Sequence, residues 1–148
     1  MAINLEKGGE EGMANYKIED IEGIGSARGA KFRAAGVKNT NSLLASSATR
    51  KQRKELAEKT GLDESQILKF ANMADLYRIK GVGSEYAELL EAAGVDSLPG
   101  LAKRKAANLA KAMKSVNETK KLVRQMPGEM QVSKWIEYAK SLPRVLKY

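Results

Sequence analysis

The fold of this chain is decided by the stretch Ile18-Glu-Asp-Ile21-Glu-Gly23-Ile24-Gly25-Ser26-Ala-Arg28-Gly29-Ala-Lys31-Phe32. Apolar residues at helical spacing lie on both sides of a Gly-hydrophobe-Gly triplet. Glycine adopts positive φ without steric cost, so this triplet can form a tight turn while Ile24 points into the core. The stretch therefore predicts two helices joined by a tight turn, and the small residue Gly29 lets those helices approach closely.

The same pattern returns 58 residues later in the chain. Nine residues between positions 21 and 43 are identical in both copies: Ile21, Gly23, Gly25, Ser26, Ala34, Ala35, Gly36, Val37 and Leu43. Further on the similarity continues at an offset of 65, where Phe70 matches Trp135. The second copy thus has extra residues in its middle, and self-similarity of this kind indicates tandem structural units.

Both copies have the apolar spacing of helices, and no stretch alternates like a half-buried strand. We therefore expect an all-α protein made of two tandem copies of a small helical unit. The expected boundaries are a flexible N-terminal extension at 1–15, a first unit at 16–76, a second unit with a basic insertion at 77–143, and a C-terminal tail at 144–148.

Several residues have the chemistry of helix ends. Ser26 and Ser84 are expected to be N-caps, and Gly36 and Gly94 are expected to end the same two helices in the left-handed conformation. Asp63 is expected to cap the helix that follows it.

The Gly-hydrophobe-Gly turns at Gly23-Ile24-Gly25 and Gly81-Val82-Gly83 resemble the helix-hairpin-helix motif. Over residues 16–143 the chain resembles an uncharacterised bacterial family of tandem helix-hairpin-helix proteins, catalogued as a domain of unknown function. The resemblance implies that backbone N–H groups at a helix start bind a nucleic-acid phosphate, which suits their unpaired state and the helix dipole. The residues it assigns to this contact are Gly23, Gly25, Ser26, Arg28 and Lys31, with Gly81 and Gly83 in the second copy.

Acidic residues surround both hairpins and oppose this assignment. Glu85, Glu88 and Glu91 follow the second hairpin, where they would repel a phosphate backbone. Glu19, Asp20 and Glu22 precede the first hairpin. The sequence therefore leaves open a second interpretation, in which the glycines only shape turns that pack helices.

The positive charge of the chain lies in its second half. Of the formal charge of +8, residues 77–148 contribute 14 basic and 7 acidic side chains. Between positions 98 and 124 one acid, Glu118, accompanies eight basic residues, which we call the basic segment: Lys103, Arg104, Lys105, Lys111, Lys114, Lys120, Lys121 and Arg124. An apolar stripe on the same predicted helix leaves these cations facing solvent, where they can bind an anion.

The composition excludes several classes of function. The chain contains neither Cys nor His, so Ser-His-Asp and Cys-His sites, common zinc sites and disulfides are impossible. No buried strand precedes Gly23, which argues against a dinucleotide-binding turn. The aromatic residues have core spacing, which argues against single-strand recognition by stacking. We expect no enzyme activity, no cofactor, no metal site and no small-molecule substrate.

These observations predict a non-enzymatic binding module that contacts the backbone of nucleic acid, duplex DNA in the first place, weakly and without sequence preference, and that uses the first hairpin and the basic segment together. The alternative is a scaffold for protein–protein interaction that uses the same helical fold. Binding that weakens steeply with salt would favour the first, because phosphate contacts release counterions. With no long apolar run and no signal-peptide pattern at its start, the chain is expected to be cytoplasmic, without a membrane partner.

Overall fold

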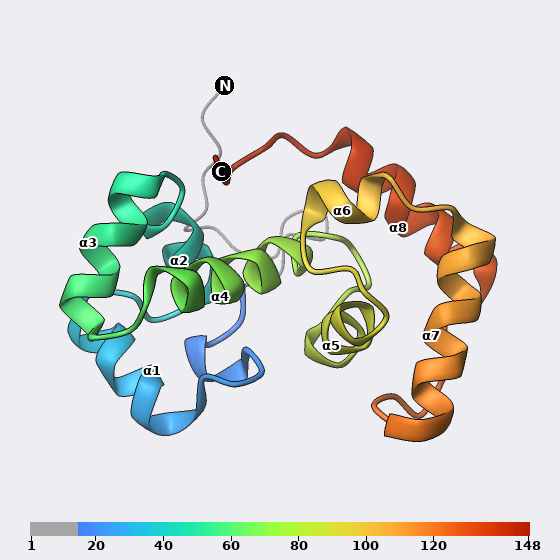
Figure 1. Ribbon diagram of the computed structural model, residues 1–148, viewed down its shortest axis with the longest axis horizontal. Helices are drawn as coiled ribbons and strands as arrows, with labels where there is room; N and C mark the ends of the chain where they lie inside the picture. Colours follow the sequence, from blue (N-terminus) through green and yellow to red (C-terminus); the bar gives the residue numbers. More distant parts are fainter. Residues whose placement is uncertain (1–14) are drawn as a thin grey trace.

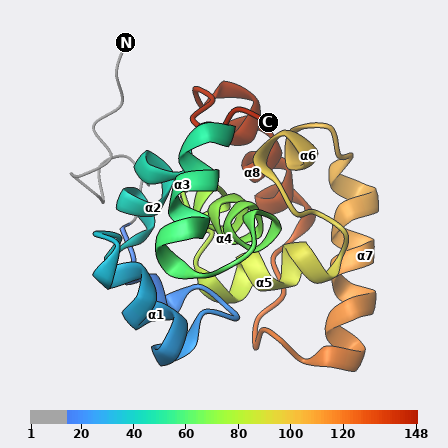
Figure 2. The same ribbon diagram turned by 60° about the vertical axis from the view of Figure 1, so that its left-hand side comes forward.

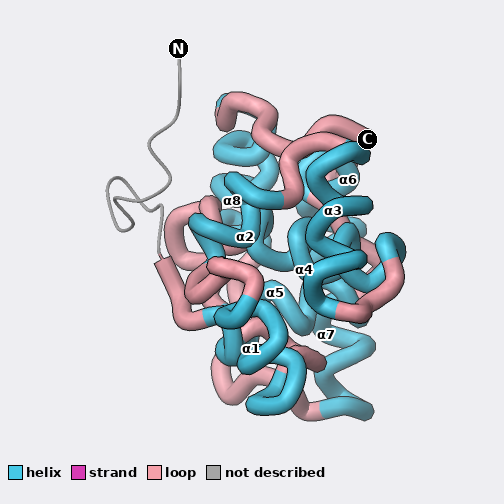
Figure 3. The backbone as a smooth tube through the Cα atoms, turned by 90° about the vertical axis from the view of Figure 1, so that its left-hand side faces the viewer, coloured by secondary structure: helices cyan, strands magenta, loops and turns pink. Residues whose placement is uncertain are grey.

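The computed structural model describes residues 15–148, and within this range the chain forms helices and loops without a strand (Figure 3). Its elements are a short 3₁₀ turn η1 (Ile18–Asp20) and the helices α1 (Gly25–Ala34), α2 (Thr40–Ser46), α3 (Arg50–Thr60), α4 (Glu64–Leu76), α5 (Ser84–Ala92), α6 (Leu98–Ala102), α7 (Ala106–Lys120) and α8 (Glu129–Ser141). The all-α prediction is confirmed for these residues. The predicted N-terminal extension falls outside them, apart from Asn15.

The helices gather around two long members, α4 and α8. Helices α2 and α3 pack against α4, and α6 and α7 pack against α8. Figure 1 shows α1 to α3 on one side of the molecule and α5 to α8 on the other, with α4 in the middle. Helix α4 also contacts α6, so one continuous core joins the two sides.

The two hairpin turns agree at the first glycine of the triplet and differ at the second. Gly23 has φ +90°, Gly81 has φ +89° and Gly25 has φ +63°, which confirms the expectation of left-handed residues in these turns. Gly83 differs, because its φ of −98° and ψ of −167° are extended. Gly83 is the residue just before α5, where an N-cap needs extended rather than left-handed backbone.

The expected C-terminal ends of the helices are confirmed. Gly36 and Gly94 have φ of +87° and +98°, directly after the last turns of α1 and α5. In each case the next N–H group, that of Val37 or Val95, donates to a carbonyl oxygen five residues earlier at 2.8 Å. This bond is typical of a helix that ends at a glycine. Asp63 lies at the N-cap of α4, as expected, and its N–H group donates to Gln66 Oε1 at 3.1 Å.

The prediction that Ser26 and Ser84 are N-caps is wrong. Helix α1 begins at Gly25, because Ile24 is already helical with φ −78° and ψ −57°, so Ser26 lies inside the first turn. Ser84 is the first residue of α5, and its Oγ donates to the carbonyl oxygen of Asp20 at 3.0 Å. An N-cap must have non-helical backbone, which neither serine has.

Phe70 of α4 and Trp135 of α8 have the same relation to the two hairpins. A Cβ atom on Gly23 would lie 3.5 Å from Phe70 Cε1, and one on Gly81 would lie 3.4 Å from Trp135 Nε1. Both aromatic side chains are buried, with exposed fractions of 4% and 1%. Each ring therefore packs against the glycine turn of its own hairpin.

Residues 142–148, which we call the C-terminal strap, fold back over the first half of the chain. Two buried arginines bind its carbonyl oxygens: Arg78 Nη2 donates to Pro143 at 2.7 Å and Arg53 Nη2 donates to Lys147 at 2.7 Å. Arg78 also pairs with buried Asp75 at 2.8 Å. Burial raises the pKa of Asp75, and the bond to Arg78 opposes that rise. The predicted tail is thus an ordered part of the core, with Leu146 buried.

Truncation of either aromatic ring should strongly destabilise the fold. We expect Trp135→Ala and Phe70→Ala each to lower the free energy of unfolding by about 3–5 kcal/mol, measured by urea denaturation, because a large cavity is left beneath a hairpin. The control is Met130→Ala on α8, whose side chain is 75% exposed; it should change stability by less than about 0.5 kcal/mol. Equal losses for all three variants would contradict this account.

Candidate nucleic-acid interface

The first hairpin exposes the start of α1. Gly25 and Ser26 are exposed, and the first-turn N–H groups of a helix have no acceptor within the helix. Arg28 Nη1 donates to the carbonyl oxygen of Gly23 at 2.9 Å, so its guanidinium group lies back over the turn. Lys31 is exposed less than one turn further along α1. The structure therefore brings these five predicted residues together on one exposed corner.

One of the acidic residues before the first hairpin is neutralised within the chain. Glu19 forms two hydrogen bonds with Arg33, both at 2.8 Å, and its side chain covers Gly29. A Cβ on Gly29 would lie 2.5 Å from Glu19 Oε2, which explains the small residue there. The hydrogen bond from Arg33 lowers the pKa of Glu19 to about 2. Asp20 and Glu22 remain exposed.

The second hairpin is partly covered by the chain itself. Ser84, at the start of α5, donates to Asp20 as described above, and a Cβ on Gly83 would lie 3.3 Å from Tyr16 Oη. The ring of Tyr77 packs edge-on against Tyr16, and burial raises the pKa of Tyr77. The segment before the first hairpin thus occupies part of the surface that a phosphate would need.

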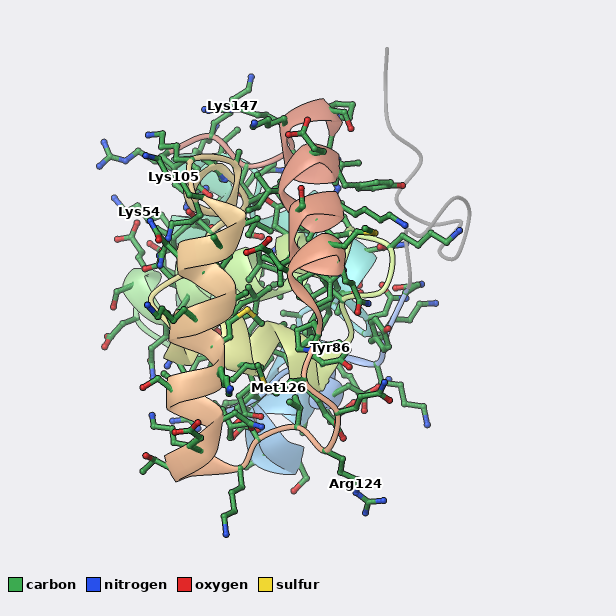
Figure 4. The ribbon with its side chains drawn as sticks, turned by 90° about the vertical axis from the view of Figure 1, so that its right-hand side faces the viewer. Lys54, Tyr86, Lys105, Arg124, Met126 and Lys147 are labelled. Atoms are coloured by element: carbon green, nitrogen blue, oxygen red, sulfur yellow. The ribbon has the colours of Figure 1, made fainter. Side chains whose placement is uncertain are left out.

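Arg124 of the basic segment lies beside this second hairpin. The loop after α7 returns to α5, where Tyr86 Oη donates to the carbonyl oxygen of Gln125 at 2.9 Å. Arg124 lines a shallow hollow of about 400 Å³ together with Gly81 and Gly83. Figure 4 shows Tyr86, Met126 and Arg124 at the same end of the molecule. Sequence spacing could not reveal this approach, because it depends on how the loop turns back.

The remainder of the basic segment follows α7 from end to end. Lys103, Arg104 and Lys105 form the corner between α6 and α7, and Lys120 and Lys121 lie at the far end of α7. The predicted apolar stripe is confirmed, since Leu109 and Met113 are fully buried. Lys111 and Lys114 border a hollow of about 510 Å³ whose lining includes Met126 and Pro127.

The structure does not join the first hairpin and the basic segment into one patch. Figures 1 and 2 place α1 and α7 on opposite sides of the molecule. Burial raises the pKa of Glu88 on α5, and the neighbouring charges of Glu22, Glu91 and Glu85 raise it further. The positive charge of Lys120 lowers the pKa of Glu88. An acidic surface on α5 therefore lies between the two basic regions.

Between residues 15 and 148 no group of carboxylates could hold a metal ion. Within the same range, every helix is too short or too polar to cross a membrane.

The model of the family described as Domain of unknown function (DUF4332) matches residues 22–142, and the chain belongs to this family. No curated protein matches the chain, and no solved structure matches it. The match agrees with the resemblance to a family of uncharacterised function and covers both hairpins.

Substitution of Gly25 measures the cost of left-handed backbone without a steric clash. Its φ is +63°, and a Cβ there would meet no atom within 4 Å. Gly25→Ala should therefore lower the free energy of unfolding by about 1 kcal/mol through strain alone. Gly25→Asn should cost less, because asparagine tolerates left-handed backbone. Equal stability of wild type and Gly25→Ala in thermal unfolding would show that the turn has another shape.

The Glu19–Arg33 pair should be visible in a carboxyl titration. In the wild type, NMR of the Glu19 carboxyl should show a midpoint near pH 2, since its pKa is lowered to about 2. Because folding lowers the pKa of Glu19, the pair stabilises the fold at neutral pH. This stabilisation is lost as the pH falls through the lowered pKa. Arg33→Gln should return the midpoint to the ordinary range. An unchanged midpoint in that variant would contradict the pairing.

Proposed function

We propose that this member of the DUF4332 family is a non-enzymatic module that binds the backbone of duplex nucleic acid, DNA in the first place, weakly and without sequence preference. The observation that supports this most directly is the unpaired charge of the basic segment. In residues 15–148 the ion pairs are Glu19–Arg33, Asp75–Arg78 and Glu137–Lys140, and none includes a residue of that segment. Unpaired surface cations favour binding to phosphates, because each contact releases a counterion.

The proposal includes two helix-hairpin-helix units, at 16–76 and 77–143. Their hairpins share hydrogen bonds at equivalent positions: Ile24 N–H donates to the Ile21 carbonyl at 3.1 Å, and Val82 N–H donates to the Ile79 carbonyl at 3.0 Å. The similar φ of Gly23 and Gly81 and the buried aromatic ring below each also support this interpretation.

The two units would contribute differently to binding. The first would offer the N–H groups of Gly25 and Ser26, with Arg28 and Lys31 beside them. The second would act through the basic segment, because α5 carries glutamates and its start bonds to Asp20. Since α1 and α7 lie apart, the proposal assigns them separate phosphate contacts. A nucleic-acid partner also implies a compartment that holds nucleic acid, which agrees with the expected cytoplasmic location.

The alternative proposal, a scaffold for protein interaction, is supported by an open groove along α8. The groove has a volume of about 1010 Å³, and its lining includes Met130, Trp135, Tyr138 and Gly81. Met130 is 75% exposed, so its apolar side chain is accessible to a partner at this groove. Protein binding at this groove would depend little on salt, in contrast to phosphate binding.

Charge reversal at the α6–α7 corner tests the nucleic-acid proposal. In fluorescence anisotropy at about 50 mM salt, the wild type should bind a labelled random duplex of about 30 base pairs, with affinity falling to about 10⁻⁴–10⁻⁶ M at physiological salt. Lys103→Glu, Arg104→Glu and Lys105→Glu together should abolish binding without loss of helicity by circular dichroism.

The matched control reverses Lys38, Lys59 and Lys134, which are exposed and lie outside both basic regions. It changes the net charge equally and should retain most of the affinity. Gly25→Ala should weaken binding only if the first hairpin takes part. If the wild type does not associate with duplex DNA or RNA at low salt, the scaffold proposal replaces this one.

A further inference from the structure

The first turn of α3 has a charge pattern that opposes its own helix dipole. Thr49 caps the helix, with its Oγ1 accepting from the Gln52 N–H at 3.2 Å. The first turn contains no acidic residue and carries Arg50 and Lys51 on its exposed side, and exposed Lys54 follows in the next turn, before Glu55. Cations at a helix N-terminus are unfavourable, since the unpaired N–H groups already make that end positive. The sequence thus concentrates positive charge where folding disfavours it.

The C-terminal strap adds more positive charge at the same place. The backbone of Lys147 is fixed by two hydrogen bonds: its N–H donates to the Ala48 carbonyl at 2.7 Å, and its carbonyl accepts from Arg53. Tyr148 Oη donates to Asn72 Oδ1 at 2.6 Å. Leu146 is buried between these bonds, so the exposed side chain of Lys147 is held beside the start of α3.

A further positive charge lies below this surface, that of Arg53, which has Arg50 and Glu64 as charged neighbours. It is 4% exposed, and its guanidinium group donates to carbonyl oxygens of Ser47, Ala48 and Lys147. In the described part of the chain it forms no ion pair with a carboxylate. Because charges in a partly buried site are weakly screened, Arg53 strengthens the positive potential outside the α3 start.

The strap connects this region to the basic segment. It lies between α3 and α6, where Arg144 and Leu146 share the lining of a hollow with Leu98 and Ala102. Figures 2 and 3 show the C-terminus beside α3 and α6. In Figure 4 Lys54, Lys105 and Lys147 point out at the same upper edge.

We infer that the first turn of α3 and the C-terminal strap form a phosphate-binding surface that continues the α6–α7 corner. We call it the strap surface and define it as Arg50, Lys51, Lys54, Arg144 and Lys147. Bound phosphates of a duplex backbone neutralise these cations and complement the dipole of α3. The inference rests on the proposed function and names a region of the interface that neither hairpin contains.

The test compares two double charge reversals in the full chain, with the same labelled duplex at several salt concentrations. Lys51→Glu with Lys147→Glu should weaken binding at least tenfold at about 50 mM salt and reduce the salt slope by about two units. The control, Lys38→Glu with Lys134→Glu, should have a salt slope within about half a unit of the wild-type slope. Thermal unfolding should show no loss of stability for the first pair, since Glu is favoured in a first helical turn.

The outcomes separate this inference from the proposed function. If the wild type binds and the Lys51/Lys147 variant binds no worse than the control, the strap surface takes no part and the inference is wrong. If the wild type itself does not bind duplex DNA or RNA, both proposals are wrong. Weaker binding by the Lys51/Lys147 variant alone, with its melting temperature retained, supports the strap surface.

Discussion

The contact between an aromatic ring and the backbone of a glycine turn is the constraint on which the rest of this structure depends. Gly23 and Gly81 have positive φ, and the rings of Phe70 and Trp135 lie directly beside them. The helices that carry these rings, α4 and α8, are also those against which their neighbours pack. The core is fixed in this way by apolar contacts, whereas the lysines of α7 form no ion pair in the described part of the chain.

The parts of the fold that depend on local chemistry could be predicted from the sequence. Glycine at Gly36 and Gly94, apolar spacing on α7, and the equivalence of Phe70 and Trp135 all follow from residue type and register. The helix starts could not be predicted to the residue. Whether Ser26 is a cap or lies in the first turn depends on the backbone angles of Ile24, and isoleucine is compatible with either conformation.

The candidate site was less predictable, because contacts distant in sequence form much of it. Arg53 binds a carbonyl 94 residues away and Arg78 binds one 65 residues away. Arg53 donates to carbonyl oxygens and forms no ion pair among the described residues. Its position could therefore not be predicted by looking for an acidic partner in the sequence. The prediction that the first hairpin and the basic segment act together could not anticipate their separation, because only the fold shows that α5 lies between them (Figure 1).

The two halves of the chain differ in the charge that they place at helix starts. In the second half Ser84, at the start of α5, donates its hydroxyl to the carbonyl oxygen of Asp20, and the glutamates of α5 repel phosphate. In the first half the start of α3 bears cations that a helix alone would not favour. A local electrostatic cost that packing does not require is expected at functional positions. An external polyanion would relieve this cost and would also neutralise the unpaired lysines of α7, which is the physical argument for the proposed phosphate-binding surface on the α3–strap–α6 side.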